Sequence, residues 1–310
     1  MNILPACLFA CVALLLPADL PAQNIVADVR RAIAAKDFAA GESLIQKDKA
    51  ARGVTPEMVE AVSWLGRGAL AAKQFDAAQG YAETARELAL AALKSRKLDD
   101  EPHLPLALGA SMEVQAHVLA AKGQLSEAIS FLQRELATYK ATSIRTRIQK
   151  NLHLLSLEGK PAPEINVKQW VGPKPPTIAA LRGKPAILFF WAHWCPTCKN
   201  QAPALAKVLA EYRSKGLALI SPTQLYGYTV EGKDATPAEE TAHIDSVRKQ
   251  VYSGLTDMPA PISEETMKVY GASTTPTLVF VDSKGIVRRY HPGLMAYEEL
   301  AASVQKLMGD

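Results

Sequence analysis

The chain has few cysteines, few aromatic residues and little excess charge. Of its 310 residues four are cysteines and 6% are aromatic, and 35 basic against 31 acidic residues give a formal net charge of +4. Because the basic residues are interleaved with acids, the sequence has no dense basic stripe of the kind that neutralises phosphates. The composition therefore disfavours nucleic acid as a partner.

The apolar run from Ile3 to Leu16 is too short for an ordinary membrane span, but it has the length of the hydrophobic region of a secretory signal. Small residues follow it at Ala18 and Ala22, although no Lys or Arg precedes it and no full A-x-A cleavage site is present. We predict that residues 1–22 are a signal peptide. The protein is then exported, to the periplasm or another extracytoplasmic compartment, or is membrane-tethered if the leader is not cleaved.

Removal of this leader would take Cys7 and Cys11 with it and leave one pair, Cys195 and Cys198. A four-thiolate zinc site would need a second pair, and the six histidines show no H-x3–5-H spacing. A structural disulfide across two residues would close a very small loop and remove little entropy from the unfolded chain. Redox chemistry without a metal is the interpretation that remains.

The first part of the mature chain, residues 24–157, is rich in Ala, Leu, Glu, Lys and Gln and is apolar at helical spacing, which predicts an all-helical domain. Three of its segments resemble one another, each with small residues, a polar turn, and an aromatic residue or Leu. They are AAKDFAAGESLI at 34–45, AAKQFDAAQGYA at 71–82 and AAKGQLSEAISFL at 120–132.

The spacing of these segments is close to a known repeat. Phe38 and Phe75 are 37 residues apart, near the tetratricopeptide period, whereas Phe75 and Leu125 are 50 apart, which predicts an insertion between them. Proline residues within 96–108 predict that this insertion is a loop. We therefore predict a tetratricopeptide-like helical array, with a generic helical bundle as the alternative. Such an array offers a concave face to a protein partner.

The second part, residues 158–310, changes class. Gly and Pro at 158–165 end the helical pattern, and short apolar runs typical of buried strands follow at 186–190, 217–222 and 277–282. Helical periodicity extends from Pro196 to Arg213 and recurs at 296–308, and a tight turn is expected at 283–285. This order predicts an α/β domain with a mixed sheet and helices on both faces.

The cysteines fall at the start of the predicted helix that follows the first strand. Cys195 would lie at the helix N-terminus with Pro196 in the first turn, where free N–H groups and the helix dipole stabilise a thiolate. Cys195 is therefore the expected nucleophile. Cys198, one helical turn further on and inward, would be the resolving thiol that attacks the mixed disulfide.

WAHWCPTCK at 191–199, followed by Pro203, and STTPTLVFVDSKG at 273–285 together resemble the thioredoxin fold. The residues at 159–163 match the G-x-P-A-P pattern near the domain start of exported TlpA/ResA-type thioredoxin-like proteins. The resemblance covers roughly 158–310. Several positions agree in order and spacing, which a lone C-x-x-C would not provide.

The resemblance implies roles for further residues. Trp191 and Trp194 take the places of the family's paired tryptophans, and we expect Trp191 in the core and Trp194 beside the substrate groove. Pro276, preceded by Thr275, falls on the family's cis-proline, which would align a substrate backbone beside the nucleophile. The predicted site is catalytic Cys195 and Cys198 with substrate-binding Trp194, Thr275 and Pro276.

Three positions depart from the family pattern. Phe189 stands where thioredoxins carry a buried Asp, and Gln201 stands where TlpA/ResA-type proteins often carry a Glu. Neither residue can move a proton to or from the buried thiol. His193 is not part of the usual constellation, and we expect it to point to solvent.

The segment at 225–263 is longer than the minimal fold requires. We interpret it as a surface elaboration with a helix from Pro237 to Tyr252. In the alternative, Tyr226 and Tyr228 near the strand end line a partner site.

These features predict an exported thiol–disulfide oxidoreductase that reduces, oxidises or isomerises protein disulfides. It would need no cofactor beyond the redox-active disulfide Cys195–Cys198. Its partners would be protein thiol or disulfide clients, an upstream thiol–disulfide donor or acceptor of electrons, and a protein held by the helical domain.

Two alternatives remain open. One is a helical-repeat binding module to which the thioredoxin domain is accessory. The other is peroxide reduction of the peroxiredoxin kind, which is disfavoured because Ala192 and Leu188 stand where that family usually has Thr and Pro.

Overall fold

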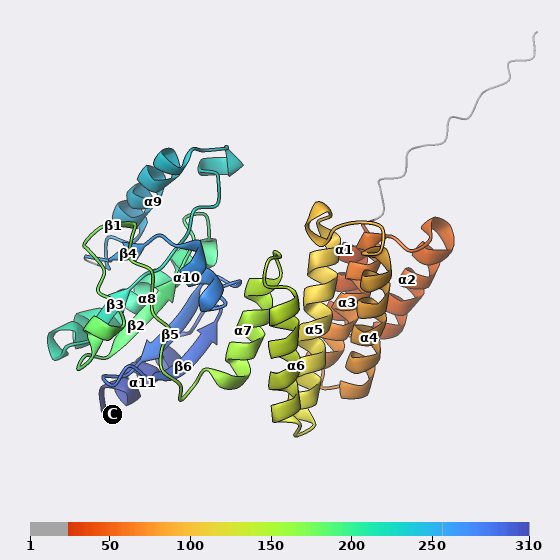
Figure 1. The fold of residues 1–310 in the computed structure, drawn as a ribbon, viewed down its shortest axis with the longest axis horizontal. Helices are drawn as coiled ribbons and strands as arrows, with labels where there is room; N and C mark the ends of the chain where they lie inside the picture. The colour runs from red at the N-terminus through yellow and green to blue at the C-terminus, as the bar shows by residue number, and fades with distance from the viewer. Residues whose placement is uncertain (1–23, 256, 310) are drawn as a thin grey trace, which may run out of the picture.

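The structure is a computed structural model that describes residues 24–255 and 257–309, so the predicted leader lies outside the described residues. A helical region comes first and a sheet with its covering helices follows (Figure 1). This arrangement confirms an all-helical N-terminal region and an α/β C-terminal part with a mixed sheet. No helix in the described part of the chain is long and apolar enough to cross a membrane.

In the described residues seven α-helices make up the helical region, and all but α4 and α5 follow one another with short connections. They are α1 (Ile25–Ala34), α2 (Phe38–Arg52), α3 (Pro56–Ala71), α4 (Phe75–Ala92), α5 (His103–Ala121), α6 (Leu125–Thr138) and α7 (Arg145–Ser156).

The three similar sequence segments form three turns with the same backbone hydrogen bonds. Lys36, Lys73 and Gly123 each have a positive φ, at 61°, 60° and 83°, and each comes two residues before the next helix. In the first turn the N–H of Lys36 donates to Ile33 and that of Asp37 donates to Ala32, and the other two turns repeat this pattern. The pattern is the Schellman motif, which satisfies the last carbonyl groups of a helix.

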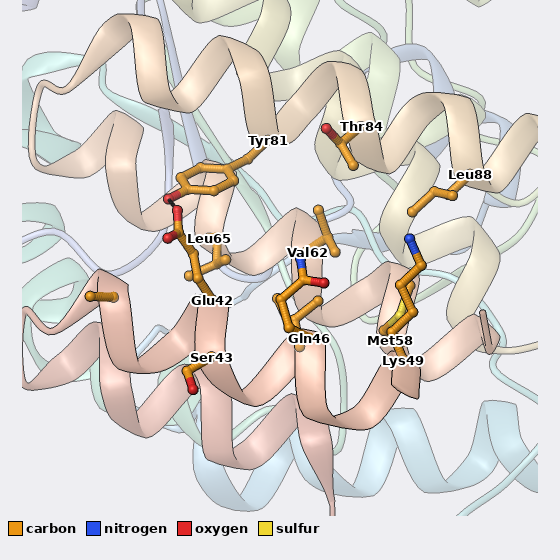
Figure 2. A pocket seen from close by; sticks show the side chains of 12 residues that line it. Glu42, Ser43, Gln46, Lys49, Met58, Val62, Leu65, Tyr81, Thr84 and Leu88 are labelled. Carbon is orange, nitrogen blue, oxygen red and sulfur yellow. Dashed lines mark hydrogen bonds between the residues drawn. The ribbon is translucent and has the colours of Figure 1, made fainter. Parts of the chain in front are cut away.

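The helices pack in a regular way. The first helices of the pairs contact one another in the order α1, α3, α5 and α7, and α2, α4 and α6 each pack against the next of these. Alanines line the buried face of α4, at Ala78, Ala82, Ala85 and Ala89. A groove of about 430 Å³ opens over α3 between α2 and α4, where Tyr81 bonds Glu42 across it (Figure 2).

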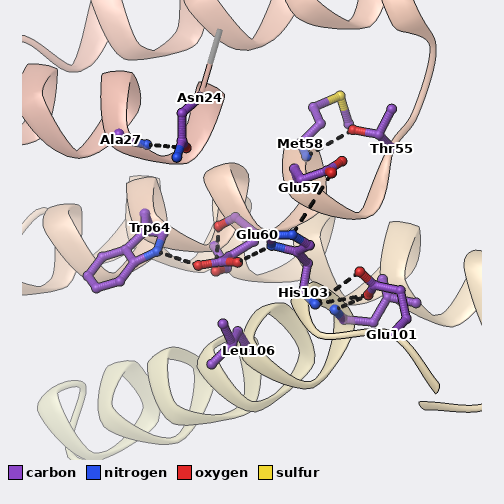
Figure 3. Close-up of polar contacts among 12 residues, drawn as sticks. Asn24, Ala27, Thr55, Glu57, Met58, Glu60, Trp64, Glu101, His103 and Leu106 are labelled. Atoms are coloured by element: carbon purple, nitrogen blue, oxygen red, sulfur yellow. Dashed lines mark hydrogen bonds and ion pairs between the residues drawn. The ribbon is translucent and has the colours of Figure 1, made fainter. Parts of the chain in front are cut away.

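The insertion between α4 and α5 is shorter than the predicted loop of 96–108. A 3₁₀ turn spans Leu98–Asp100, and α5 begins at His103 with Pro105 in its first turn, where a missing N–H costs nothing. The Glu101 carboxylate accepts hydrogen bonds from the His103 and Leu104 N–H groups. His103 Nδ1 lies 2.7 Å from Oε2 of buried Glu60 on α3, which fixes the insertion to the array (Figure 3).

Four strands form the main sheet in the order β3-β2-β5-β6. Strand β2 pairs in parallel with β3 and antiparallel with β5, and β5 pairs antiparallel with β6. A two-residue pair, β1 with β4, was not predicted from the sequence. The strands are β1 (Trp170–Val171), β2 (Ala186–Phe190), β3 (Ala218–Ile220), β4 (Ala260–Pro261), β5 (Thr277–Val281) and β6 (Val287–Pro292).

Helices cover both faces of this sheet. Residues Ile187 and Phe189 of β2 pack with α8 (Pro196–Tyr212), α9 (Pro237–Val251) and α11 (Tyr297–Gly309). The alternate residues Leu188 and Phe190 pack on the other face with α10 (Glu264–Val269).

Helix α7 joins the two parts of the molecule, because it packs against α10 and β6 (Figure 1). Arg145 donates two hydrogen bonds to the Glu265 carboxylate, at 2.9 and 3.1 Å. His153 Nε2 lies 2.8 Å from the carbonyl oxygen of Val269, and burial lowers the pKa of His153. A direct α7–sheet interface therefore fixes the helical region against the sheet.

Candidate active site

The two cysteines occupy the N-terminus of α8, directly after β2. Cys195 is the N-cap residue and its Sγ accepts a hydrogen bond of 3.1 Å from the N–H of Cys198, while Pro196 is the first helical residue. The cysteines form a disulfide with their Cα atoms 5.3 Å apart, and their exposed fractions are 2% and 0%. When the disulfide opens, this N–H and the helix dipole would stabilise a thiolate at Cys195.

The loop before β5 faces this disulfide. The Thr275–Pro276 peptide bond is cis, and the Thr275 carbonyl oxygen lies 3.4 Å from Cys195 Sγ. Backbone bonds hold the loop, since the Gly293 N–H donates to the Pro276 oxygen at 2.7 Å. The structure thus brings together Cys195, Cys198, Thr275 and Pro276, which lie about 80 residues apart in the sequence.

The two tryptophans differ as expected. Trp191 is fully buried, and its Nε1–H donates to the Ser221 carbonyl oxygen at 2.9 Å. Trp194 is 45% exposed and has its ring edge against Tyr226, with 5.4 Å between ring centroids. An exposed aromatic face therefore lies next to the disulfide.

The expectation that His193 points to solvent is wrong. His193 is 2% exposed, and its Nε2 lies 3.2 Å from Oε1 of Glu240, which is itself fully buried on α9. Glu240 also accepts hydrogen bonds from the N–H groups of Tyr226 and Gly227, at 2.6 and 2.8 Å. The long segment before β4 therefore supplies a buried carboxylate that holds both His193 and the loop that packs on Trp194.

Aromatic rings enclose the rest of this imidazole. Tyr226, Tyr228 and His243 lie edge-on to it, with centroids between 5.0 and 5.7 Å away. Burial lowers the pKa of His193, and His243 acts in the same direction while Glu240 opposes it. A neutral imidazole with its proton on Nε2 satisfies the bond to Glu240. No sequence signal distinguished Glu240 from Glu239 beside it.

Phe189 and Gln201, which stand where related families carry a carboxylate, are buried and uncharged. The Gln201 side chain accepts a hydrogen bond from Met295 N–H at 2.8 Å and donates to the Met295 oxygen at 3.1 Å. Phe189 packs edge-on against Tyr252 with 6.0 Å between centroids. Among the described residues, no group of three or more His, Cys, Asp and Glu side chains is placed to hold a metal ion.

Sequence comparisons match the part of the chain that contains this site. The family model described as the AhpC/TSA family matches residues 159–290. The thiol:disulfide interchange protein DsbE of Pseudomonas fluorescens biotype C is 32% identical over 156 residues, which are 49% of this chain and 78% of that protein. The thiol-disulfide oxidoreductase ResA of Oceanobacillus iheyensis is 26% identical over 145 residues, 46% of this chain and 68% of that protein.

A solved structure also matches about half of this chain. The thiol:disulfide interchange protein of the thioredoxin family from Chlorobium tepidum has 20% sequence identity and a TM-score of 0.38, and the match covers 49% of this chain and 98% of that one.

Proposed function

Since the chain belongs to the thioredoxin-like thiol–disulfide oxidoreductases of the DsbE/ResA type, we propose that it exchanges disulfides with protein clients through Cys195 and Cys198. The observation that carries this proposal is the disulfide at the N-terminus of α8 with the Thr275 carbonyl beside it. Trp194, Thr275 and Pro276 form the surface that receives the client.

The exchange has two steps. In the reduced protein the Cys195 thiolate attacks a client disulfide, forms a mixed disulfide and releases one client thiolate. The Cys198 thiolate then attacks Cys195 Sγ, which closes the Cys195–Cys198 disulfide and releases the second client thiolate. Two electrons pass to the client, and its two thiolates take up protons. The reverse sequence oxidises a client dithiol, and a separate thiol–disulfide partner restores the starting state.

Burial supports different roles for the two sulfurs. The Cys195 sulfur lies next to the partly exposed Thr275 and the exposed Trp194, whereas Cys198 has no exposed surface. In this proposal the client sulfur attacks Cys195, and Cys198 is the leaving or resolving group.

The test compares two serine variants. Cys195→Ser should abolish exchange, and Cys198→Ser should leave a mixed disulfide between Cys195 and the client, which non-reducing electrophoresis and intact-mass measurement detect. A Cys195→Ser protein with unimpaired exchange would refute the proposal. Turnover of hydrogen peroxide without any disulfide exchange would favour peroxide reduction instead.

The direction of electron flow follows from the reduction potential of the pair, equilibrated against glutathione or dithiothreitol and measured by alkylation. A value of about −270 mV would indicate a reductant, and a value of about −120 mV would indicate an oxidase or isomerase.

The helical region acts in this proposal as a tetratricopeptide-like array that holds a protein partner. Three helical pairs with the same turn geometry, stacked in sequence order, support this interpretation. The protein acts outside the cytoplasm, because the leader predicted at residues 1–22 would direct its export.

A further inference from the structure

A cavity of about 410 Å³ lies where the helical region meets the thioredoxin-like part. Arg67 of α3 and Arg147 and Lys150 of α7 line one side of it, and Ser273 and Thr274 line the other. The cavity is thus built from both parts of the molecule, and neither part supplies it alone.

The cavity has an excess of positive charge. Arg67, Arg147 and Lys150 all contact one carboxylate, that of Glu113 on α5, at N–O distances of 3.4, 3.1 and 3.1 Å. Three cations share one anion, so two positive charges are not neutralised within the cluster. None of the described residues that line the cavity carries a carboxylate. The hydroxyl group of Ser143, which lines the cavity, donates a hydrogen bond to Asp99.

Partial burial makes this charge effective. The side chains of Lys150 and Arg147 are 13% and 18% exposed, and charges removed from bulk water interact more strongly than those at an open surface. Burial opposes ionisation of Glu113, but Arg147, Lys150 and Arg67 more than offset it and hold its pKa well below the ordinary value. Burial also lowers the pKa of Lys150, and Glu113 opposes that shift. The carboxylate is therefore ionised at neutral pH and does not act as a further hydrogen-bond donor.

The chain links the cavity to the disulfide through two consecutive residues. Thr274, in its wall, is followed directly by Thr275, whose carbonyl oxygen is 3.4 Å from Cys195 Sγ. An extended peptide advances about 3.3 Å per residue, so a client with its cysteine at Cys195 reaches Thr274 within roughly three residues.

We propose that this cavity binds an acidic segment of the client polypeptide, a few residues from the cysteine that Cys195 attacks. The proposal rests on the proposed exchange function and adds a substrate preference to it. Carboxylates of the client would bond to Arg67, Arg147 and Lys150, and the Ser273 and Thr274 hydroxyl groups would donate to them. Helix α7 then has a role in selecting clients as well as in joining the two parts.

The experiment uses the full mature chain and two disulfide-containing peptides that differ only in three residues flanking one cysteine, Asp in one and Asn in the other. We expect the acidic peptide to react roughly tenfold faster than the amide peptide at low salt, as electrostatic steering allows, and this ratio to fall as salt screens the charges. Dithiothreitol oxidation measures exchange without a client segment.

Two variants locate the effect, and a third controls for net charge. Arg67→Gln should lower the acid-to-amide rate ratio about threefold or more, and Ser273→Glu should abolish or reverse this ratio. Lys47→Gln removes one exposed charge from α2 and should leave the ratio unchanged.

The outcomes separate the two proposals. If neither peptide reacts, the proposed exchange function fails. If both react at the same rate, or if Lys47→Gln lowers the ratio as much as Arg67→Gln does, exchange stands and the acidic-client inference is overturned. An unchanged ratio in Arg67→Gln and Ser273→Glu would also overturn it.

Discussion

The amide of Gln201 shows how one buried side chain is fitted to its backbone partner. Both polar ends are satisfied by Met295, the oxygen by its N–H and the nitrogen by its carbonyl oxygen, and Gln201 has no exposed surface. A neutral group that both accepts and donates is required here. An ionised carboxylate can only accept, so it would face the Met295 oxygen without a proton between them.

We therefore predict a pH-dependent loss of stability in Gln201→Glu. A protonated carboxyl group can keep both hydrogen bonds, so the folded state raises the pKa of Glu at this position above the ordinary value of about 4.3. The contribution of the protonated carboxyl group to the free energy of unfolding is fully present below pH about 4.3. It is lost as pH rises, by up to about 1.4 kcal/mol per pH unit, until the folded-state pKa is reached. Urea unfolding of the oxidised protein at several pH values measures it.

Gln250→Glu is the matched control, because Gln250 is exposed near the end of α9. Its effect should stay within about 0.5 kcal/mol at every pH. If the two variants lose the same free energy of unfolding at every pH, the side chain at position 201 does not need to donate a hydrogen bond.

Residue identities near the disulfide could be predicted only in part. The sequence placed Cys195, Cys198, Trp191 and Trp194 correctly relative to the start of the helix, because local motifs encode that placement. It could not place His193, since the Glu240 carboxylate that accepts its hydrogen bond lies 47 residues away in the sequence. A buried polar pair of this kind is a tertiary contact without a local pattern.

Close packing of helices depends on glycines that the repeat pattern does not mark. A Cβ at Gly66 of α3 would meet only ordinary contacts, the nearest at 3.5 Å. A Cβ at Gly68 would lie 2.6 Å from Cγ2 of Ile33 and 3.2 Å from Phe38. Gly66 faces α4, whereas Gly68 faces Ile33 of α1, so the close approach of α3 to α1 depends on Gly68.

We predict that Gly68→Ala destabilises the helical region. The overlap with Ile33 falls on a β-branched side chain with little freedom to move, and such overpacking costs about 1–3 kcal/mol, more than the roughly 1 kcal/mol that Ala gains in helix propensity. Thermal unfolding followed by far-UV circular dichroism measures the change.

Gly80→Ala is the control for this prediction. Gly80 is exposed in α4 and nothing lies within 4 Å of its added Cβ, so the variant should be more stable by up to about 1 kcal/mol. The interpretation fails if Gly68→Ala stabilises the protein to the same extent.

Element boundaries followed from local signals where these were strong. The prediction of β2 matches residue for residue, and those of α8 and α9 end one residue late, because apolar runs and helix-start prolines mark them. The loop predicted at 96–108 was wrong at its second half, since a proline in the first turn does not break a helix. Strands β1 and β4 have two residues each, too few for any periodicity.

In the molecule as a whole, the contact between the helical region and the thioredoxin-like part depends on Gly271. Its φ is +64°, and a Cβ there would lie 2.4 Å from the backbone nitrogen and 2.6 Å from the Cα of Lys150 on α7. Backbone atoms in the middle of a helix cannot yield as a side-chain end can. No sequence pattern marked this glycine, because the atoms that it meets lie about 120 residues earlier.

We predict that Gly271→Ala loosens α7 from the sheet. The positive φ alone costs an L-residue about 1–2 kcal/mol, and the overlap with Lys150 adds about 1–3 kcal/mol or more. Amide hydrogen exchange should therefore become faster over residues 145–156 and in β6, while residues 196–212 of α8 should keep their protection.

Gly285→Ala separates the two causes, because Gly285 has a φ of +78° but nothing within 4 Å of an added Cβ. This variant should be destabilised only by the cost of the positive φ, and amide hydrogen exchange over residues 145–156 should stay unchanged. If both variants give the same exchange pattern, the approach of Gly271 to Lys150 does not hold the interface together. If only Gly271→Ala exposes α7, the cavity walls formed by Arg147, Lys150 and Thr274 owe their spacing to this one glycine, and the acid-to-amide rate ratio should fall in the same variant.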